Sequence, residues 1–187
     1  RKEHAEKLAS SINDLNVRRR EFDNKITEEA LQMIQQDEKL LQAKSTVIFN
    51  ENWHKGVIGI VASRLTDSYY RPTIVLTRSN NLITGSARSI KNFDIYDAID
   101  NCSDLLEHFG GHKYAAGLSL KPEKLEEFRM RFEEYVANNI DNEELIPELN
   151  VDLEINFSDI TPKFVRVLKQ FAPFGPGNMA PVFLSRN

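Results

Sequence analysis

Apolar residues recur at helical spacing along the first forty residues, and no glycine or proline interrupts them between residues 3 and 43. They fall at positions 8, 12 and 15, and again at 26, 30, 33 and 34. This spacing predicts one long helix, or two helices with a break near 13–16 or 18–21. Because a small domain does not need so long a helix, we expect a connection that runs in from a preceding domain.

Short β-branched runs then alternate with helical patterns. We predict strands at 45–50, 73–77, 82–89 and 118–120, with a turn at 80–81. We predict helices at 57–65, at 94–109, and from Pro122 through Val136. This alternation indicates an α/β fold with a mixed β-sheet flanked by helices.

The C-terminal region changes character. An acidic linker at 138–150 is followed by an alternating strand at 151–155 and a helix through Leu168, capped by Ser158 or Asp159. A turn rich in proline and glycine at 173–178 precedes an apolar run that is typical of the first strand of another domain. We therefore expect a connecting helix at 1–44, a central domain at 45–140, and a linker with the beginning of a further domain at 141–187.

Composition narrows the class of protein. Of the 187 residues, 41% are hydrophobic and 28% charged, as in ordinary globular proteins. No apolar run approaches the roughly 20 residues of a membrane helix, and the charged N-terminus does not resemble a signal peptide. The single Cys102 excludes an internal disulfide and fits a reducing cytoplasm; we expect a buried, inert thiol. A chain that begins within a charged helical pattern indicates a piece of a longer protein.

Charge is unevenly distributed along the chain, although the net charge is only −4. Residues 54–93 contain six Lys or Arg and one acid, whereas residues 122–160 contain twelve acids and three Lys or Arg. Residues 161–187 contain four Lys or Arg and no acid. This distribution suits a polyanionic ligand that approaches a basic central face. The alternative is that the basic residues are scattered over a solvated surface.

The stretch Gly110–Gly117 is the strongest candidate for chemistry. Gly110 and Gly111 leave the backbone open to a ligand, His112 supplies a donor, and Lys113 adds a cation. A basic, glycine-rich turn of this kind is a plausible phosphate cradle. The alternative is a glycine turn with a capping histidine.

Two further basic segments contain small residues at predicted junctions between elements, where α/β folds place ligand groups. In the first, Trp53 and His54 precede Lys55; in the second, Ser86 and Ser89 flank Arg88, which can hold a phosphate through two parallel hydrogen bonds. Trp53 and Tyr114 are candidates for stacking on a nucleobase, with core packing as the alternative for Trp53.

The sequence lacks the residues that other kinds of active site require. The four histidines show no metal-ligand spacing with matching acids, and His108 and His112 are separated by a glycine pair. There is no serine-nucleophile elbow and no Walker loop. The sequence thus contains parts for binding a polyanion but no self-sufficient catalytic machinery.

Four segments carry a family resemblance. Phe109–Gly117 resembles the signature of the DHH-associated domain of DHH-family phosphoesterases. Asn52–Leu65 resembles a segment typical of the RecJ family of single-strand-specific exonucleases, and Gly85–Ser89 matches its Ser-x-Arg-Ser motif. Phe174–Asn178 resembles the junction that leads into the oligonucleotide-binding (OB) barrel of that family. The likeness covers nearly the whole chain.

The resemblance implies a 5′-to-3′ exonuclease that acts on single-stranded DNA in recombination and repair, as a cytoplasmic protein. It implies Mn²⁺ or Mg²⁺ bound by a preceding DHH domain whose motifs are missing here, so we expect no metal in this chain and no activity from it alone. By the matched motifs, His112 and Arg88 hold the phosphate beside the scissile bond. The other expected substrate contacts are Ser86, Ser89, Gly110, Gly111, Lys113, Trp53, His54 and Lys55.

The expected ligand is single-stranded DNA, bound by a monomer without membrane association. A single-strand-binding protein or a helicase is the expected kind of protein partner. Two alternatives stay open: an oligoribonuclease or cyclic-dinucleotide phosphodiesterase of the same superfamily, and a non-catalytic nucleotide-binding module. Preference for longer strands separates a nuclease from a nucleotide module.

Overall fold

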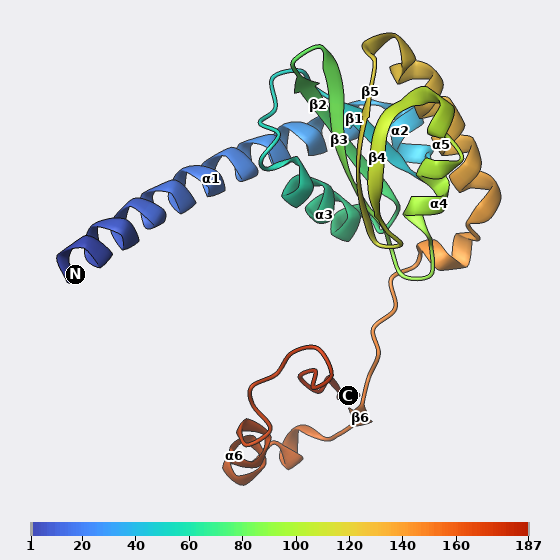
Figure 1. The fold of residues 1–187 in the computed structure, drawn as a ribbon. Coiled ribbons are helices and arrows are strands. Elements are labelled where there is room, and N and C mark those ends of the chain that lie inside the picture. The colour runs from blue at the N-terminus through green and yellow to red at the C-terminus, as the bar shows by residue number, and fades with distance from the viewer. Residues whose placement is uncertain (1, 187) are drawn as a thin grey trace. The chain divides into compact units, whose positions relative to one another are not determined.

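The computed structural model describes residues 2–186 of the chain. The chain divides into two compact units, Arg1–Ile146 and Pro147–Asn187. The first unit holds a long helix and a five-stranded sheet with helices on both faces, and the second holds one helix and two short strands (Figure 1). Among the described residues, no helix is long and apolar enough to cross a membrane.

The long N-terminal helix is confirmed as α1 (Lys2–Gln36), which is followed at once by the short α2 (Glu38–Gln42). Ile26, Ala30 and Ile34 of α1 are buried, whereas the side chains described before Asp23 are exposed. The break lies at Asp37, not at 13–16 or 18–21. The Asp37 backbone is extended, and its carboxylate accepts hydrogen bonds from the N–H groups of the following turn, as an N-cap does.

The sheet is mixed, as the sequence predicts. Its strand order is β1 (Thr46–Phe49), β2 (Thr73–Ser79), β3 (Leu82–Arg88), β5 (Ala115–Leu120) and β4 (Leu106–His112). β1 and β2 are parallel and are connected by α3 (Ile58–Tyr69), while the other neighbours are antiparallel. β1 and β4 are therefore the edge strands.

Alternate strand residues supply two separate cores. Ile74 and Leu76 face α4 (Ile95–Asp100) and α5 (Leu125–Asn139), with α5 preceded by a 3₁₀ turn at Pro122–Lys124. Val75 faces the opposite way and packs with α1 and α3. Because α3 lies against β2 and β3, no described helix of the first unit covers this second face over β5 and β4 (Figure 1).

The predicted helix at 94–109 is wrong in its second half. The chain forms α4, a 3₁₀ turn at Ser103–Leu105, and then β4, which pairs with β5. The helical spacing is real as far as Leu105, since those apolar residues face the core, but the following backbone groups bond to a neighbouring strand. The stretch Gly110–Gly117 is consequently a hairpin and not a loop, with Lys113 and Tyr114 as its turn.

A 3₁₀ turn at Asn142–Leu145 closes the first unit. In the second unit, β6 (Leu153–Glu154) pairs in parallel with β7 (Phe183–Leu184), and α6 spans Pro162–Lys169. The N-cap of α6 is Thr161, whose Oγ1 accepts the Phe164 N–H at 3.2 Å. The predicted caps Ser158 and Asp159 are wrong, because the 3₁₀ turn Phe157–Asp159 contains both and Pro162 sets the helix start.

Candidate functional site

The register of three strands places Arg88 and His112 on the same face of the sheet. Arg88 of β3 pairs with Ala115 of β5, and Ala115 pairs with His112 of β4. Residues directly opposite each other in an antiparallel ladder point to the same face. Two strand spacings separate the backbones of Arg88 and His112 by about 10 Å, and this face is the one left uncovered over β5 and β4.

The next row on this face has almost no side chains. Ser86 pairs with Gly117, which pairs with Gly110. A Cβ atom on Gly110 would meet nothing within 4 Å, and one on Gly117 would meet only the Gly85 carbonyl oxygen at 3.9 Å. Packing therefore does not require glycine at either position, and both are exposed. They form the open floor of a shallow strip beside Arg88.

Arg88 is half-buried and bonds only to neutral oxygen atoms. Its Nε donates to Ser63 Oγ at 3.1 Å, and its Nη1 donates to Ser86 Oγ at 2.9 Å and to the Ala87 carbonyl at 2.8 Å. Burial lowers the pKa of Arg88, yet a guanidinium remains protonated at neutral pH. Within residues 2–186 no carboxylate pairs with it. A positioned cation without a counterion is suited to bind an anion.

The N-terminus of α3 approaches this cation closely. A Cβ atom on Gly59 would lie 3.0 Å from Arg88 Nη2 and 3.1 Å from Ser86 Oγ, so glycine admits both side chains. No side chain caps the helix at Val57, and no acid lies in its first turn. The partial positive charge of this helix end adds to that of Arg88. Ser63 is not among the contacts expected from the sequence. Its only distinguishing feature there is its position four residues after Gly59.

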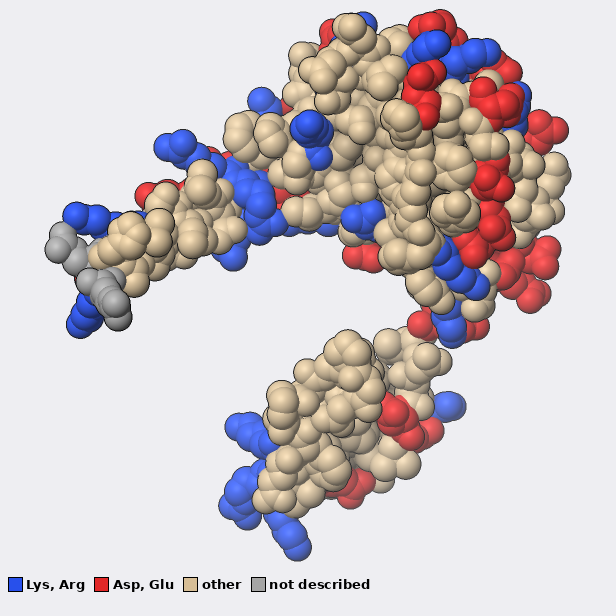
Figure 2. Space-filling view, viewed as in Figure 1, with Lys and Arg blue, Asp and Glu red and all other residues tan. Residues whose placement is uncertain are grey.

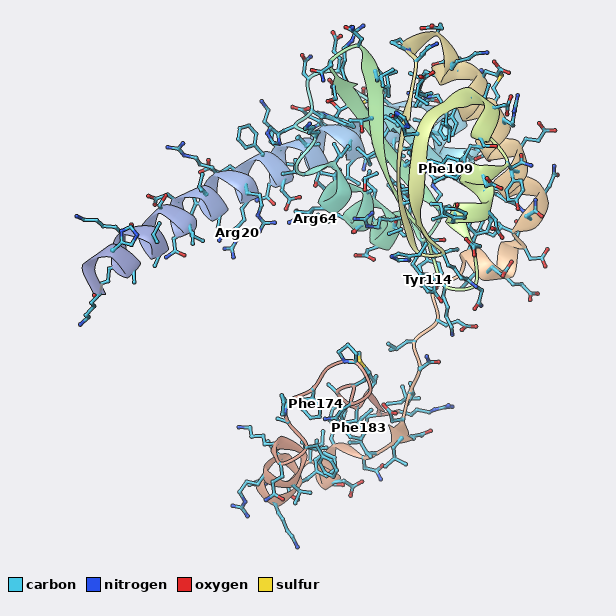
Figure 3. All side chains as sticks on the ribbon, viewed as in Figure 1. Arg20, Arg64, Phe109, Tyr114, Phe174 and Phe183 are labelled. Atoms are coloured by element: carbon cyan, nitrogen blue, oxygen red, sulfur yellow. The ribbon has the colours of Figure 1, made fainter. Side chains whose placement is uncertain are left out.

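His112 lies exposed at the end of β4, before the hairpin turn. Its Nδ1 accepts the Tyr114 N–H at 3.3 Å, so in the neutral imidazole Nε2 carries the proton and is left as a donor. Figure 3 shows Tyr114 at the tip of this hairpin, and Lys113 Nζ lies 5.9 Å from its ring centroid. His112 thus caps the hairpin turn through Nδ1 and still has a free donor at Nε2.

Gly110 and Gly111 do not form a loop cradle. Both belong to β4, where amide groups lie in the plane of the sheet and do not converge on one point. Gly111 is required by packing, since a Cβ atom there would lie 2.3 Å from the Ala115 carbonyl oxygen and 2.5 Å from Ala116 Cα. The expected backbone cradle is therefore replaced by an open glycine floor at Gly110.

Two expected contacts are directed elsewhere. Trp53 is only 4% exposed, and its Nε1 donates to Glu29 at 2.8 Å, so the core-packing alternative is the one observed and no ring face is left for a base. Ser89 Oγ donates to the Phe93 carbonyl at 2.8 Å, which uses the proton that a phosphate would need. Of the two serines that flank Arg88 in the sequence, the structure places Ser86 against it.

His54 and Lys55 are exposed on the loop before α3. His54 accepts the Gly56 N–H at 3.1 Å, and its ring stacks on Phe22 of α1 with 5.9 Å between centroids. No contact within the described part of the chain joins either residue to Arg88 or His112. They border the start of α3 and do not belong to the strip on the sheet.

The basic surplus of residues 54–93 does not form one surface. Arg71 is buried and bonds to backbone carbonyls, and Arg78 pairs with Glu51. Arg64 Nη2 lies 2.7 Å from Asp23 of α1, and Figure 3 shows it beside that helix. Figure 2 shows Lys and Arg gathered along α1 and Asp and Glu over α5. Of the four arginines in this range, Arg64 and Arg78 are paired with acids and Arg71 is buried, whereas Arg88 lies on the sheet face with neutral partners.

Among the described residues, no three His, Cys, Asp or Glu side chains are grouped so that they could hold a metal ion. The strip contains a guanidinium, hydroxyls, an imidazole and a helix N-terminus. These groups can bind and orient an anion such as a phosphate, but they contain neither a nucleophile with its base nor a metal-ligand set.

The fold and the site together define an α/β domain whose exposed sheet face carries a guanidinium without an acidic partner in the described chain. The model of the DHHA1 domain matches residues 23–138, and the chain belongs to this family. The model of the RecJ OB domain matches residues 151–187, in agreement with the predicted start of an OB-type domain.

Curated relatives confirm the resemblance to the RecJ family. The single-stranded-DNA-specific exonuclease RecJ of Bacillus subtilis is 40% identical over 185 residues, which cover 98% of this chain and 23% of that protein. The Escherichia coli protein of the same name is 32% identical, over 94% of this chain and 32% of its own length. The chain thus spans a third or less of each of these relatives.

Solved structures confirm the fold. The crystal structure of RecJ in complex with Mn²⁺ from Thermus thermophilus superposes with a TM-score of 0.81 at 30% identity, covering 94% of this chain and 25% of that one. A crystal structure of exonuclease RecJ bound to manganese gives a TM-score of 0.61 at 30% identity, over 71% of this chain and 32% of that one.

Proposed function

We propose that this chain is the substrate-binding portion of a RecJ-like 5′-to-3′ exonuclease that degrades single-stranded DNA in recombination and repair. The observation that carries the proposal is Arg88, a half-buried guanidinium whose partners are all neutral and which shares an uncovered sheet face with His112. A phosphodiester group of the DNA supplies the negative charge that the partners of Arg88 lack.

Each residue of the strip has a distinct role in the proposal. Arg88 Nη2 and the Ser86 hydroxyl bind the phosphate beside the scissile bond, with the α3 N-terminus behind them. His112 donates from Nε2 across the strip, and Gly110 and Gly117 let the strand lie close to the sheet. Lys113 adds a cation at the hairpin turn.

The chemistry of bond cleavage belongs to another part of the proposed full-length protein. Residues 2–186 present no metal-ligand set, so Mn²⁺ or Mg²⁺ would be held by a DHH domain outside this sequence. The role of this chain is to position the phosphate, and the isolated chain is inactive. It works in the cytoplasm as a monomer, with a single-strand-binding protein or a helicase as the protein partner.

Charge reversal tests the proposal. Binding of a single-stranded oligothymidylate to the purified chain should weaken by about an order of magnitude or more between low and physiological salt, as expected when a few phosphates are contacted. Arg88→Glu should weaken binding far more than Arg18→Glu, which reverses an exposed charge on α1. Equal losses from the two variants would show that the strip is not the binding surface.

A further inference from the structure

The uncovered sheet face continues beyond the glycine floor to a third row, in which Thr84 of β3 pairs with Ser119 of β5 and Ser119 pairs with His108 of β4. The part of this row beyond α3 consists of His108 and Ser119. The two residues are directly paired, so their side chains point to the same face. His108 lies two positions from Gly110, as Ser119 does from Gly117, and therefore on the same side of each strand as the floor.

Within residues 2–186 the side chains of His108 and Ser119 lack a partner, whereas the Thr84 hydroxyl donates to the Leu118 carbonyl at 3.4 Å. His108 is exposed and Ser119 is half-buried, and within the described chain neither makes a hydrogen bond or an ion pair through its side chain. The imidazole and the hydroxyl are both donors. They form a second group of free donors on the strip, separated from Arg88 and His112 by the row that contains Gly110 and Gly117.

The spacing of the two groups excludes a single phosphate as their common ligand. His108 and His112 are four residues apart in a strand, which places their backbones about 13 Å apart. Arg88 is displaced from His108 by the same four residues and, in addition, by two strand spacings, so a phosphate held by Arg88 does not also contact the His108 imidazole. A ligand that contacts both groups needs phosphates at more than one position, joined by a flat segment that passes over Gly110 and Gly117.

We infer that His108 and Ser119 form a second phosphate subsite, so that the strip takes an oligonucleotide lying along β5 and not a single nucleotide. This inference rests on the proposed function, because it extends the same site. His108 is a binding residue in this proposal: it holds a phosphate one or more nucleotides away from the one bound by Arg88, and it adds affinity only when the ligand is long enough to reach it.

Ligand length provides the test. Kd values of the full chain are measured by calorimetry at low salt for thymidine 5′-monophosphate and for a 5′-phosphorylated pentathymidylate. His108→Ala should weaken pentathymidylate binding about three- to tenfold, the value of one ordinary hydrogen bond at an exposed position, and leave the mononucleotide unchanged. His108→Arg should restore pentathymidylate binding. His4→Ala, an exposed histidine on α1, is the matched control.

An unchanged Kd of His108→Ala for pentathymidylate would overturn the second subsite, and so would equal losses for both ligands. Arg88→Ala separates this failure from that of the proposed function, since it should weaken both ligands. If Arg88→Ala weakens neither, the proposed function is wrong as well. Because His108 is exposed and its side chain has no partner within the described chain, its substitution should not change the thermal midpoint, which is measured on each variant.

Discussion

The Nε atom of Arg88 donates to the Oγ atom of Ser63 at 3.1 Å, which joins the end of β3 to α3. The Ser63 hydroxyl donates in turn to the Gly59 carbonyl at 3.1 Å, so its proton is occupied and its lone pair faces the guanidinium. The direction of the Arg88 side chain is thus set by a helix residue that lies 25 positions earlier in the chain.

Ser63→Ala removes this acceptor without creating a charge. We expect single-stranded DNA binding to weaken about three- to tenfold, because Arg88 loses one of the contacts that orient it, and the free energy of unfolding to fall by about 1 kcal/mol. The matched control is Ser68→Ala, since the Ser68 hydroxyl makes the same kind of bond to the Arg64 carbonyl on the same helix. Equal binding losses in the two variants would contradict the orienting role.

The adjacent glycines of the hairpin should respond differently to the same substitution. Gly111→Ala forces a Cβ atom against backbone atoms of β5, so we expect a loss of roughly 2–4 kcal/mol in the free energy of unfolding. Gly110→Ala meets no atom and should cost less than about 0.5 kcal/mol. Chemical denaturation followed by circular dichroism measures both values.

Gly110→Ala should nevertheless weaken DNA binding, because it places a methyl group on the floor over which the strand passes. Anisotropy with a labelled oligothymidylate measures this on a variant that remains folded. If Gly110→Ala binds as the unmodified chain does, the ligand does not cross the floor at that point.

Local motifs in the sequence are sufficient to find Arg88, Ser86 and the glycine pair, because each contributes through its own chemistry. The register is not local: Gly117 opposite Ser86, and His108 in a row with Ser119, follow from pairing between strands that the sequence pattern does not separate. Glycines have no side chain to show an alternating pattern, which is why the spacing predicts helix and loop where β4 lies.

Trp53 illustrates a second limit on what the sequence alone can predict about the site. An aromatic residue beside a histidine and a lysine has the composition of a stacking platform, and nothing nearby in the chain contradicts it. Its burial depends on α1, where Glu29 accepts the indole N–H from a position 24 residues earlier. Ser63 was missed for the converse reason, since a serine inside an apolar helix gains its role only from the Arg88 side chain of a strand.

Cys102 gives the chain a pH dependence at high pH. Burial, with a smaller contribution from Asp104, raises the pKa of its thiol from 9.0 to about 11, against the opposing effect of Arg131. A folded pKa above the unfolded one stabilises the protein fully below about pH 9, and this stabilisation is lost as the pH rises through 11.

We expect that loss to be about 2 kcal/mol in the free energy of unfolding. Lysines and tyrosines titrate in the same range, so Cys102→Ala is the comparison. The unmodified chain should lose more stability than the variant between about pH 8 and pH 11 in urea denaturation. Parallel pH profiles would mean that the thiol ionises as readily in the folded chain as in the unfolded one.

His112→Ala separates binding from folding at the centre of the proposed site. The imidazole is exposed, and its one hydrogen bond within the described chain is the 3.3 Å contact with the Tyr114 N–H, so the thermal midpoint should barely move. In the full-length protein, the loss of one preorganised donor at a phosphate should reduce turnover by roughly 10²-fold. His4→Ala, exposed on α1, should change neither quantity. A midpoint lowered by several degrees, with turnover per folded molecule preserved, would instead identify His112 as the cap of its hairpin.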